Sequence, residues 1–140
     1  MDTSQIEFHS ECDFELKNQQ DIVVWMNAIA KEEGKHIGAL NYIFCDDEYL
    51  HKINVEFLDH DTYTDIITFD YCVGNELISD IYVSVERVKE NAHEFSDSFE
   101  EEFYRVLVHG LLHLCGYKDK SEEDKDIMRK KENYYLSLRA

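Results

Sequence analysis

Two histidines, His109 and His113, stand four residues apart in an apolar segment that ends at Gly116. Residues four apart lie one above the other on a single helical face, about 5–6 Å apart at Cβ. That spacing lets two imidazoles bind one tetrahedral metal ion at about 2.0–2.1 Å each. Gly116 can end the helix with a positive φ, so that the reversed chain brings Asp119 back over the same face. The spacing predicts a metal site at the end of a helix, with His109, His113 and Asp119 as ligands.

Two imidazoles and one carboxylate leave one position of a tetrahedral ion open. An open position is typical of catalytic sites, in which Zn²⁺ lowers the pKa of a water molecule towards about 7. The same ligand set suits Ni²⁺, Co²⁺ or Fe²⁺, so the identity of the metal stays open. The alternative is that both histidines only form hydrogen bonds on a partly buried helix.

Helix and strand patterns interleave in the segments that must position these residues. The helix of His109 is predicted to begin near residues 96–98, where Ser98 forms a capping-box pattern with Glu101, and to stop at Gly116. The alternation of apolar residues predicts strands at residues 5–9, 38–45, 66–71 and 77–85. Helices are expected at residues 21–33, 47–57 and 85–94, and after a cap formed by Ser121 and Asp124. Gly74 and Asn75 predict a hairpin turn. The fold class is therefore α/β (α+β), with helices packed on a mixed sheet.

The composition indicates one globular domain over residues 1–140. Hydrophobic residues make up 44% of the chain, enough for a core, and no proline or low-complexity linker marks a boundary. No apolar run approaches the roughly 18–20 residues that span a bilayer. The N-terminal residues lack the basic and apolar pattern of a secretory signal. We therefore expect a soluble, cytoplasmic protein without a membrane partner.

The net charge of −17, from 31 acidic and 14 basic residues, repels nucleic acid at long range. It favours solubility or a basic partner such as a ribosomal protein. The four cysteines contain no CxxC pair and are expected to be reduced, buried residues. They are Cys12, Cys45, Cys72 and Cys115.

Residues 109–119 read HGLLHLCGYKD, which resembles the signature H-G-x-L-H-L-x-G-Y-D-H of the YbeY family of metal-dependent endoribonucleases. Residues 53–69, INVEFLDHDTYTDIITF, are similar to the family's L-N-x-x-Y-R-x-x-D-x-P-T-D-V-L-S-F element. Residues 79–84 and the downstream M-x-x-x-E at residues 128–132 also fit. The resemblance covers residues 53–132 in register.

This resemblance implies a mixed sheet of about four strands and one zinc ion held by His109, His113 and Asp119. It also implies cleavage of single-stranded RNA in ribosomal RNA maturation and quality control, at the small ribosomal subunit. The chain departs from the family pattern at three positions. Asp119 replaces the third histidine, Leu58 replaces an arginine thought important for activity, and Tyr63 replaces a proline.

Phosphate charge must be met by cations. Arg105 lies four residues before His109 on the same helical face, and Lys118 and Lys120 flank Asp119. We therefore assign Arg105 and Lys118 as candidate catalytic residues. The alternatives are an ion pair between Arg105 and a glutamate one turn before it, and ordinary loop charges at the two lysines.

Two aspartates sit next to strand-forming residues. Asp65 is the third candidate catalytic residue, since with Thr68 it could line the cleft; its alternative role is to cap the loop. Asp80 lies within an apolar strand, where a buried carboxylate needs a partner. A hydrogen bond to a ligating imidazole would supply one.

Two other functions compete with the nuclease. A metalloprotease fits the spacing of the ligands, but those enzymes carry a glutamate after the first histidine, where this chain has Gly110. A ribosome-assembly factor of weak or no activity, which keeps a structural metal, fits Leu58 and the acidic composition.

Overall fold

A computed structural model describes residues 6–58 and 64–139 of the chain. Within these residues lie four strands: β1 (Ile6–Ser10), β2 (His36–Cys45), β3 (Ile66–Asp70) and β4 (Glu76–Ser84). The helices are α1 (Gln19–Glu32), α2 (Asp47–Leu58), α3 (Val85–Glu94), α4 (Phe99–Leu114) and α5 (Glu122–Ser137). The sheet has the order β1-β2-β4-β3; β1–β2 and β2–β4 pair in parallel, and β3–β4 in antiparallel fashion. The predicted mixed sheet of about four strands with packed helices is confirmed.

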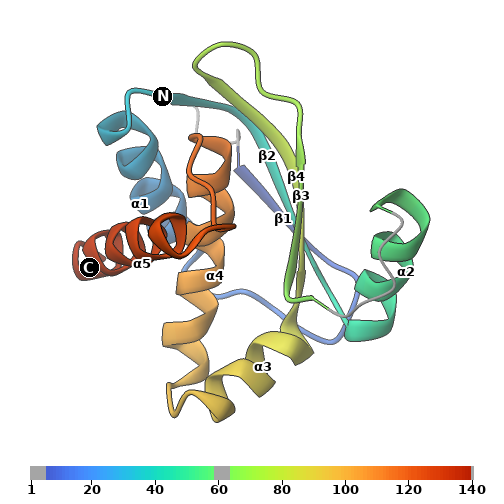
Figure 1. Cartoon of the computed structure of the whole chain (residues 1–140). Helices are drawn as coiled ribbons and strands as arrows, with labels where there is room; N and C mark the ends of the chain where they lie inside the picture. Colours follow the sequence, from blue (N-terminus) through green and yellow to red (C-terminus); the bar gives the residue numbers. More distant parts are fainter. Residues whose placement is uncertain (1–5, 59–63, 140) are drawn as a thin grey trace.

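The two faces of the sheet carry different helices. Helices α1, α4 and α5 lie on one side of the sheet and α2 lies on the other, while α3 sits at one end (Figure 1). Alternate side chains of a strand point to opposite faces. In β4 the fully buried Ile81 faces α4, whereas Tyr82 packs in the smaller cluster around Leu50 of α2. The main core therefore lies between the sheet and the layer of α1 and α4.

Helix α4 is the central helix, and most of its residues are buried. The side chain of Ser98 caps it by accepting a hydrogen bond of 3.1 Å from the backbone N–H of Glu101. At Gly110 the helix approaches the sheet so closely that a Cβ atom would lie 2.8 Å from Cδ1 of Ile66. His109, the residue before Gly110, therefore lies close to the start of β3.

The element boundaries differ slightly from the expected ones. β2 begins at His36 rather than at residue 38, because its first residues still pair with β4. Gln5, the first residue of the expected N-terminal strand, and Tyr63 lie outside the described residues. Ser121 and Asp124 form a complete capping box at the start of α5, as predicted. All four cysteines, each within the described part of the chain, are unpaired as expected, but Cys45 is buried whereas the other three are only half-buried.

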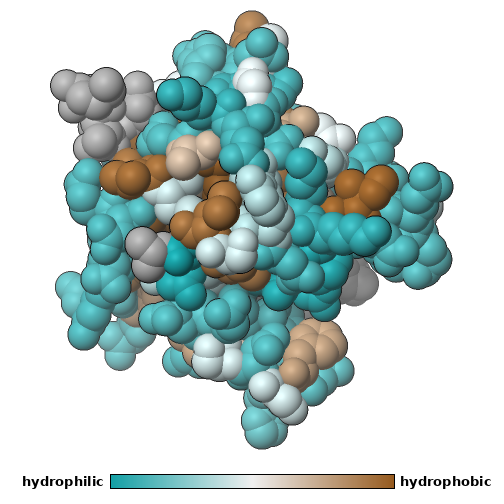
Figure 2. Space-filling model, turned by 90° about the vertical axis from the view of Figure 1, so that its left-hand side faces the viewer, coloured by the Kyte–Doolittle hydropathy of each residue, from teal (hydrophilic) through white to brown (hydrophobic). Residues whose placement is uncertain are grey.

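The surface fits the acidic composition. Figure 2 views the side on which α1 and α5 lie in Figure 1, and hydrophilic residues cover most of this face around separate hydrophobic patches. Within the described residues, none of the helices combines the length and the apolar character that a bilayer crossing requires.

Candidate metal centre

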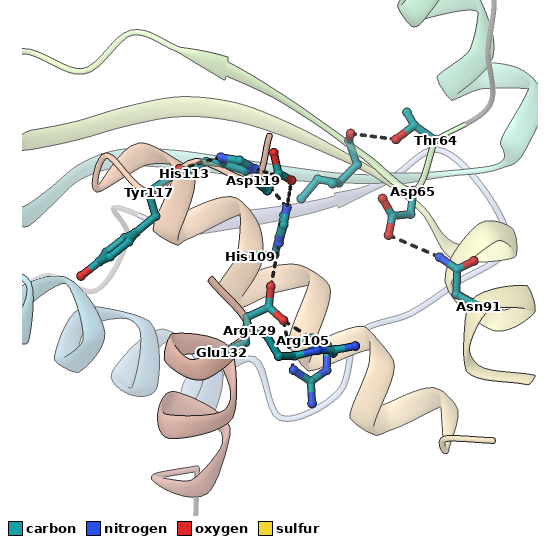
Figure 3. A network of polar contacts seen from close by, with 11 residues as sticks. Thr64, Asp65, Asn91, Arg105, His109, His113, Tyr117, Asp119, Arg129 and Glu132 are labelled. Carbon is teal, nitrogen blue, oxygen red and sulfur yellow. Dashed lines mark hydrogen bonds and ion pairs between the residues drawn. The ribbon is translucent and has the colours of Figure 1, made fainter. Parts of the chain in front are cut away.

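The last two turns of α4 and the turn after it bring three ligand atoms together (Figure 3). Nε2 of His109 lies 3.0 Å from Nε2 of His113. Oδ2 of Asp119 lies 3.1 Å from the first of these nitrogens and 3.4 Å from the second. Gly116, at a φ of 107°, reverses the chain so that Asp119 returns over the helix. The three predicted ligands therefore form one cluster.

Both imidazoles are fixed through their other ring nitrogen. Nδ1 of His113 lies 2.9 Å from the backbone carbonyl oxygen of Tyr117, and Nδ1 of His109 lies 2.7 Å from Oε2 of Glu132. A carbonyl oxygen and a carboxylate only accept hydrogen bonds, so Nδ1 is the donating nitrogen of each ring. Nε2 is therefore the nitrogen through which each imidazole, when it carries a single ring proton, can bind a metal ion in the cluster.

Three acceptor atoms that face one another without a cation would repel. Ligands about 2.05 Å from a tetrahedral ion are separated by roughly 3.3 Å, and the three observed separations of 3.0–3.4 Å agree with this. The donor set of two imidazoles and one carboxylate suits Zn²⁺ and other divalent transition metals. The residues present therefore fit a metal ion.

A proton competes for the same place. Burial lowers the pKa of His109, but the hydrogen bond and charge of Glu132, with the charges of Asp119 and Asp65, outweigh it and raise that pKa above its ordinary value. The charge that raises the pKa of the imidazole also makes it a stronger metal ligand.

Glu132 is the residue that sequence reasoning missed. Its side chain is 7% exposed, and it also accepts a hydrogen bond of 3.0 Å from Nη1 of Arg105. Arg105 therefore lies on the face of His109 as predicted, but its ion pair is with Glu132 of α5 rather than with a glutamate one turn before it. The fit of residues 128–132 to the M-x-x-x-E element was the available signal.

A cleft of about 330 Å³ opens beside the cluster, between α4, α5 and the start of β3. It is lined by His109, Asp119 and Asp65, whereas Thr68, which the sequence placed beside Asp65, is not among its lining residues. Oδ2 of Asp65 lies 3.4 Å from the side-chain nitrogen of Asn91. Burial raises the pKa of Asp65, with the charge of His109 opposing that shift. A carboxyl group of this kind next to a candidate metal centre suits proton transfer.

The whole chain matches a known family. The family model described as "Endoribonuclease YbeY" matches residues 5–139. The chain belongs to the YbeY family. Proteins named "Endoribonuclease YbeY" from Flavobacterium johnsoniae and Christiangramia forsetii are 59% and 54% identical, covering 95% and 99% of this chain and 96% of each relative. The solution structure of a Thermotoga maritima protein superposes with a TM-score of 0.65 at 28% identity, covering 94% of this chain and 86% of that one.

The three residues that depart from the YbeY pattern lie in different parts of the chain. Asp119 takes the position of the third histidine and joins the cluster. Leu58 is the last residue of α2, the helix on the other face of the sheet, and its side chain is 40% exposed. Tyr63 lies outside the described residues.

The cleft is also lined by two cationic residues that the sequence analysis did not single out. Lys125 and Arg129, both of α5, lie at its edge together with Arg105. Lys118 is exposed in the turn before Asp119, and its candidate catalytic role stays a prediction.

The predicted role of Asp80 was wrong. Its Oδ1 accepts a hydrogen bond of 3.1 Å from Asn41, and Asp80 lies on the same face of β4 as Tyr82, away from α4. Glu132 and the Tyr117 carbonyl oxygen hold the two ligating imidazoles instead.

Proposed function

We propose that this chain is a metal-dependent endoribonuclease that cleaves single-stranded RNA in ribosomal RNA maturation and quality control. The observation that carries the proposal is the convergence of the two Nε2 atoms and the Asp119 carboxylate on one point. Membership of the YbeY family supports RNA as the substrate. We propose Zn²⁺ as the metal, with Ni²⁺ or another divalent ion as the alternative.

A bound divalent metal would supply Lewis-acid activation of water and of the phosphodiester. The chain's own residues orient the ligands and handle protons. Glu132 fixes the ring of His109, and Arg105 in turn holds the Glu132 carboxylate. Asp65 lies across the cleft with its pKa raised by burial, so that it can accept a proton from the attacking water or return one to the leaving oxygen.

The place of action is also a proposal. We expect a cytoplasmic protein that meets its RNA at the small ribosomal subunit, where basic ribosomal proteins complement the net charge of −17. A ribosome-assembly factor without turnover is the second candidate, because Leu58 replaces the family's arginine.

The test is cleavage of matched single-stranded and double-stranded RNA at low salt by the full chain, with its metal content measured. We expect cleavage of the single strand, loss of activity with a chelator and recovery when Zn²⁺ is restored. His113→Ala should remove both metal and activity, whereas His93→Ala, at an exposed histidine of α3, should keep both.

Cleavage that survives in His113→Ala would contradict the metal mechanism. Co-sedimentation with the small ribosomal subunit without any turnover would favour the assembly factor. Hydrolysis of peptides without cleavage of RNA would favour a metalloprotease.

A further inference from the structure

The cleft beside the metal cluster has a basic edge on α5. Lys125 and Arg129 are four positions apart, so they lie on one helical face about 6 Å apart along the axis. Glu132 continues this face three residues on and contacts His109. Figure 3 shows Arg129 close to Glu132, and the spacing of four residues places Lys125 on the same face of α5.

The charges of these two residues are available to a ligand. The side chains of Lys125 and Arg129 are 57% and 59% exposed, and their ion pairs with Glu122 and Glu132 are long, at 3.9 Å each. Exposed ion pairs of this kind contribute little energy and exchange readily for a better partner. Arg105, by contrast, is 18% exposed and bound to Glu132 at 3.0 Å.

The cleft also carries four acidic residues, which a polyanion must overcome. They are Asp65, Glu102, Asp119 and Glu132. Asp119 belongs to the candidate metal cluster, and Glu132 forms an ion pair with Arg105 and a hydrogen bond with His109. A strand of RNA that reaches the cluster past the edge of α5 meets two cations before it meets the remaining carboxylates.

We propose that Lys125 and Arg129 form the phosphate-binding edge of the cleft and hold the RNA backbone next to the scissile phosphodiester. This inference rests on the proposed nuclease function. It assigns to α5 the cationic contact with the substrate that Leu58 cannot make. Direct contact of two phosphates with two cations releases counterions and sets a measurable salt dependence.

The experiment titrates the full chain, in chelator, into a fluorescein-labelled short single-stranded RNA and follows the anisotropy over a series of salt concentrations. In parallel, the metal-loaded chain is assayed for KM and kcat. Each phosphate contact with a single strand contributes roughly 0.7 to the slope of log affinity against log salt. For Lys125→Ala/Arg129→Ala, which loses two contacts, we expect this slope to become shallower by about 1.4. KM should rise while kcat changes little.

The matched control is Lys52→Ala/Lys130→Ala, which removes the same charge from exposed positions. Lys52 is on α2, and Lys130 is about 100° around α5 from Arg129. The control should leave the slope nearly unchanged, and Lys125→Arg/Arg129→Lys should retain it.

Equal slopes in the two double alanine variants would mean that only net charge matters, and would overturn this inference. If the unaltered chain cleaves RNA while Lys125→Ala/Arg129→Ala keeps its KM and slope, the phosphate edge alone is wrong. If the unaltered chain neither binds nor cleaves single-stranded RNA, both the proposed function and this inference are wrong.

Discussion

Oε2 of Glu132 lies 2.7 Å from Nδ1 of His109, although 23 positions separate the two residues in the chain. This contact joins α5 to α4 at the metal cluster. It orients the imidazole so that Nε2 faces His113 and Asp119 in the candidate metal cluster.

The first prediction concerns this contact. Glu132→Gln keeps the shape of the side chain but removes the charge that fixes His109, so Zn²⁺ affinity should fall by about 10–100-fold. Competition with a chromophoric chelator measures the affinity. Glu123→Gln, at an exposed position of α5, is the matched control and should bind the metal normally. An unchanged affinity in Glu132→Gln would show that the ring is oriented by other contacts.

The third ligand can be exchanged for the one typical of the family. Asp119→His restores three imidazoles, so the variant should still bind one Zn²⁺ per chain. Asp119→Ala leaves two ligands and should lose affinity by at least about 10-fold. The metal content of each variant after dialysis distinguishes Asp119→His from Asp119→Ala. Full metal occupancy in Asp119→Ala would mean that Asp119 is not a ligand.

Asp65 is predicted to transfer a proton and not to bind the metal. Asp65→Asn should lower kcat by about 10²–10⁴-fold, the usual contribution of a general acid or base, while the metal content stays at the wild-type level. Asp126→Asn, at an exposed position of α5, should keep full activity. Loss of metal together with activity in Asp65→Asn would reassign Asp65 to the support of the ligands.

Glu33 is predicted to make stability depend on pH. Burial raises the pKa of Glu33, but hydrogen bonds from Tyr135, Tyr117 and Lys131 outweigh it and hold that pKa below the ordinary value of 4.5. A lowered pKa stabilises the folded chain fully above pH 4.5 and loses this contribution as the pH falls through the folded-state value.

The measurement is urea denaturation of the wild type and Glu33→Gln over a range of pH. Glu33→Gln should cost about 1–3 kcal/mol near neutral pH, because it leaves the tyrosine donors poorly matched. The difference should shrink below pH 4.5. Glu15→Gln, at an exposed position, should show no such trend. A difference independent of pH would mean that the charge of Glu33 contributes nothing.

Local features of the site were readable from the sequence. The spacing of His109 and His113, the turn at Gly116 and the caps at Ser98 and Ser121 each depend on residues within a few positions of one another. Such features follow from helix geometry and backbone conformation, which short patterns specify.

The partners of the ligands were not readable in the same way. Glu132 reaches His109 only because α5 packs against α4, and the sequence pattern of α5 does not state which helix it meets. The predicted partner of Asp80 was wrong for a related reason. The alternation of residues in β4 defines two faces of the strand but does not indicate which face lies against α4. Both answers depend on tertiary packing between distant segments.

The anchoring of each imidazole by a different segment has a thermodynamic consequence. Tyr117, whose carbonyl oxygen holds His113, also donates its hydroxyl to Glu33, and Lys131 of α5 donates to the same carboxylate. The turn after α4 is therefore tied to α5 and to the residue that follows α1. An ion that binds only this folded arrangement shifts the unfolding equilibrium by mass action, by about 2.7 kcal/mol at a hundredfold excess over Kd. The melting temperature of the chain should therefore rise with the concentration of free metal and fall when a chelator removes the metal.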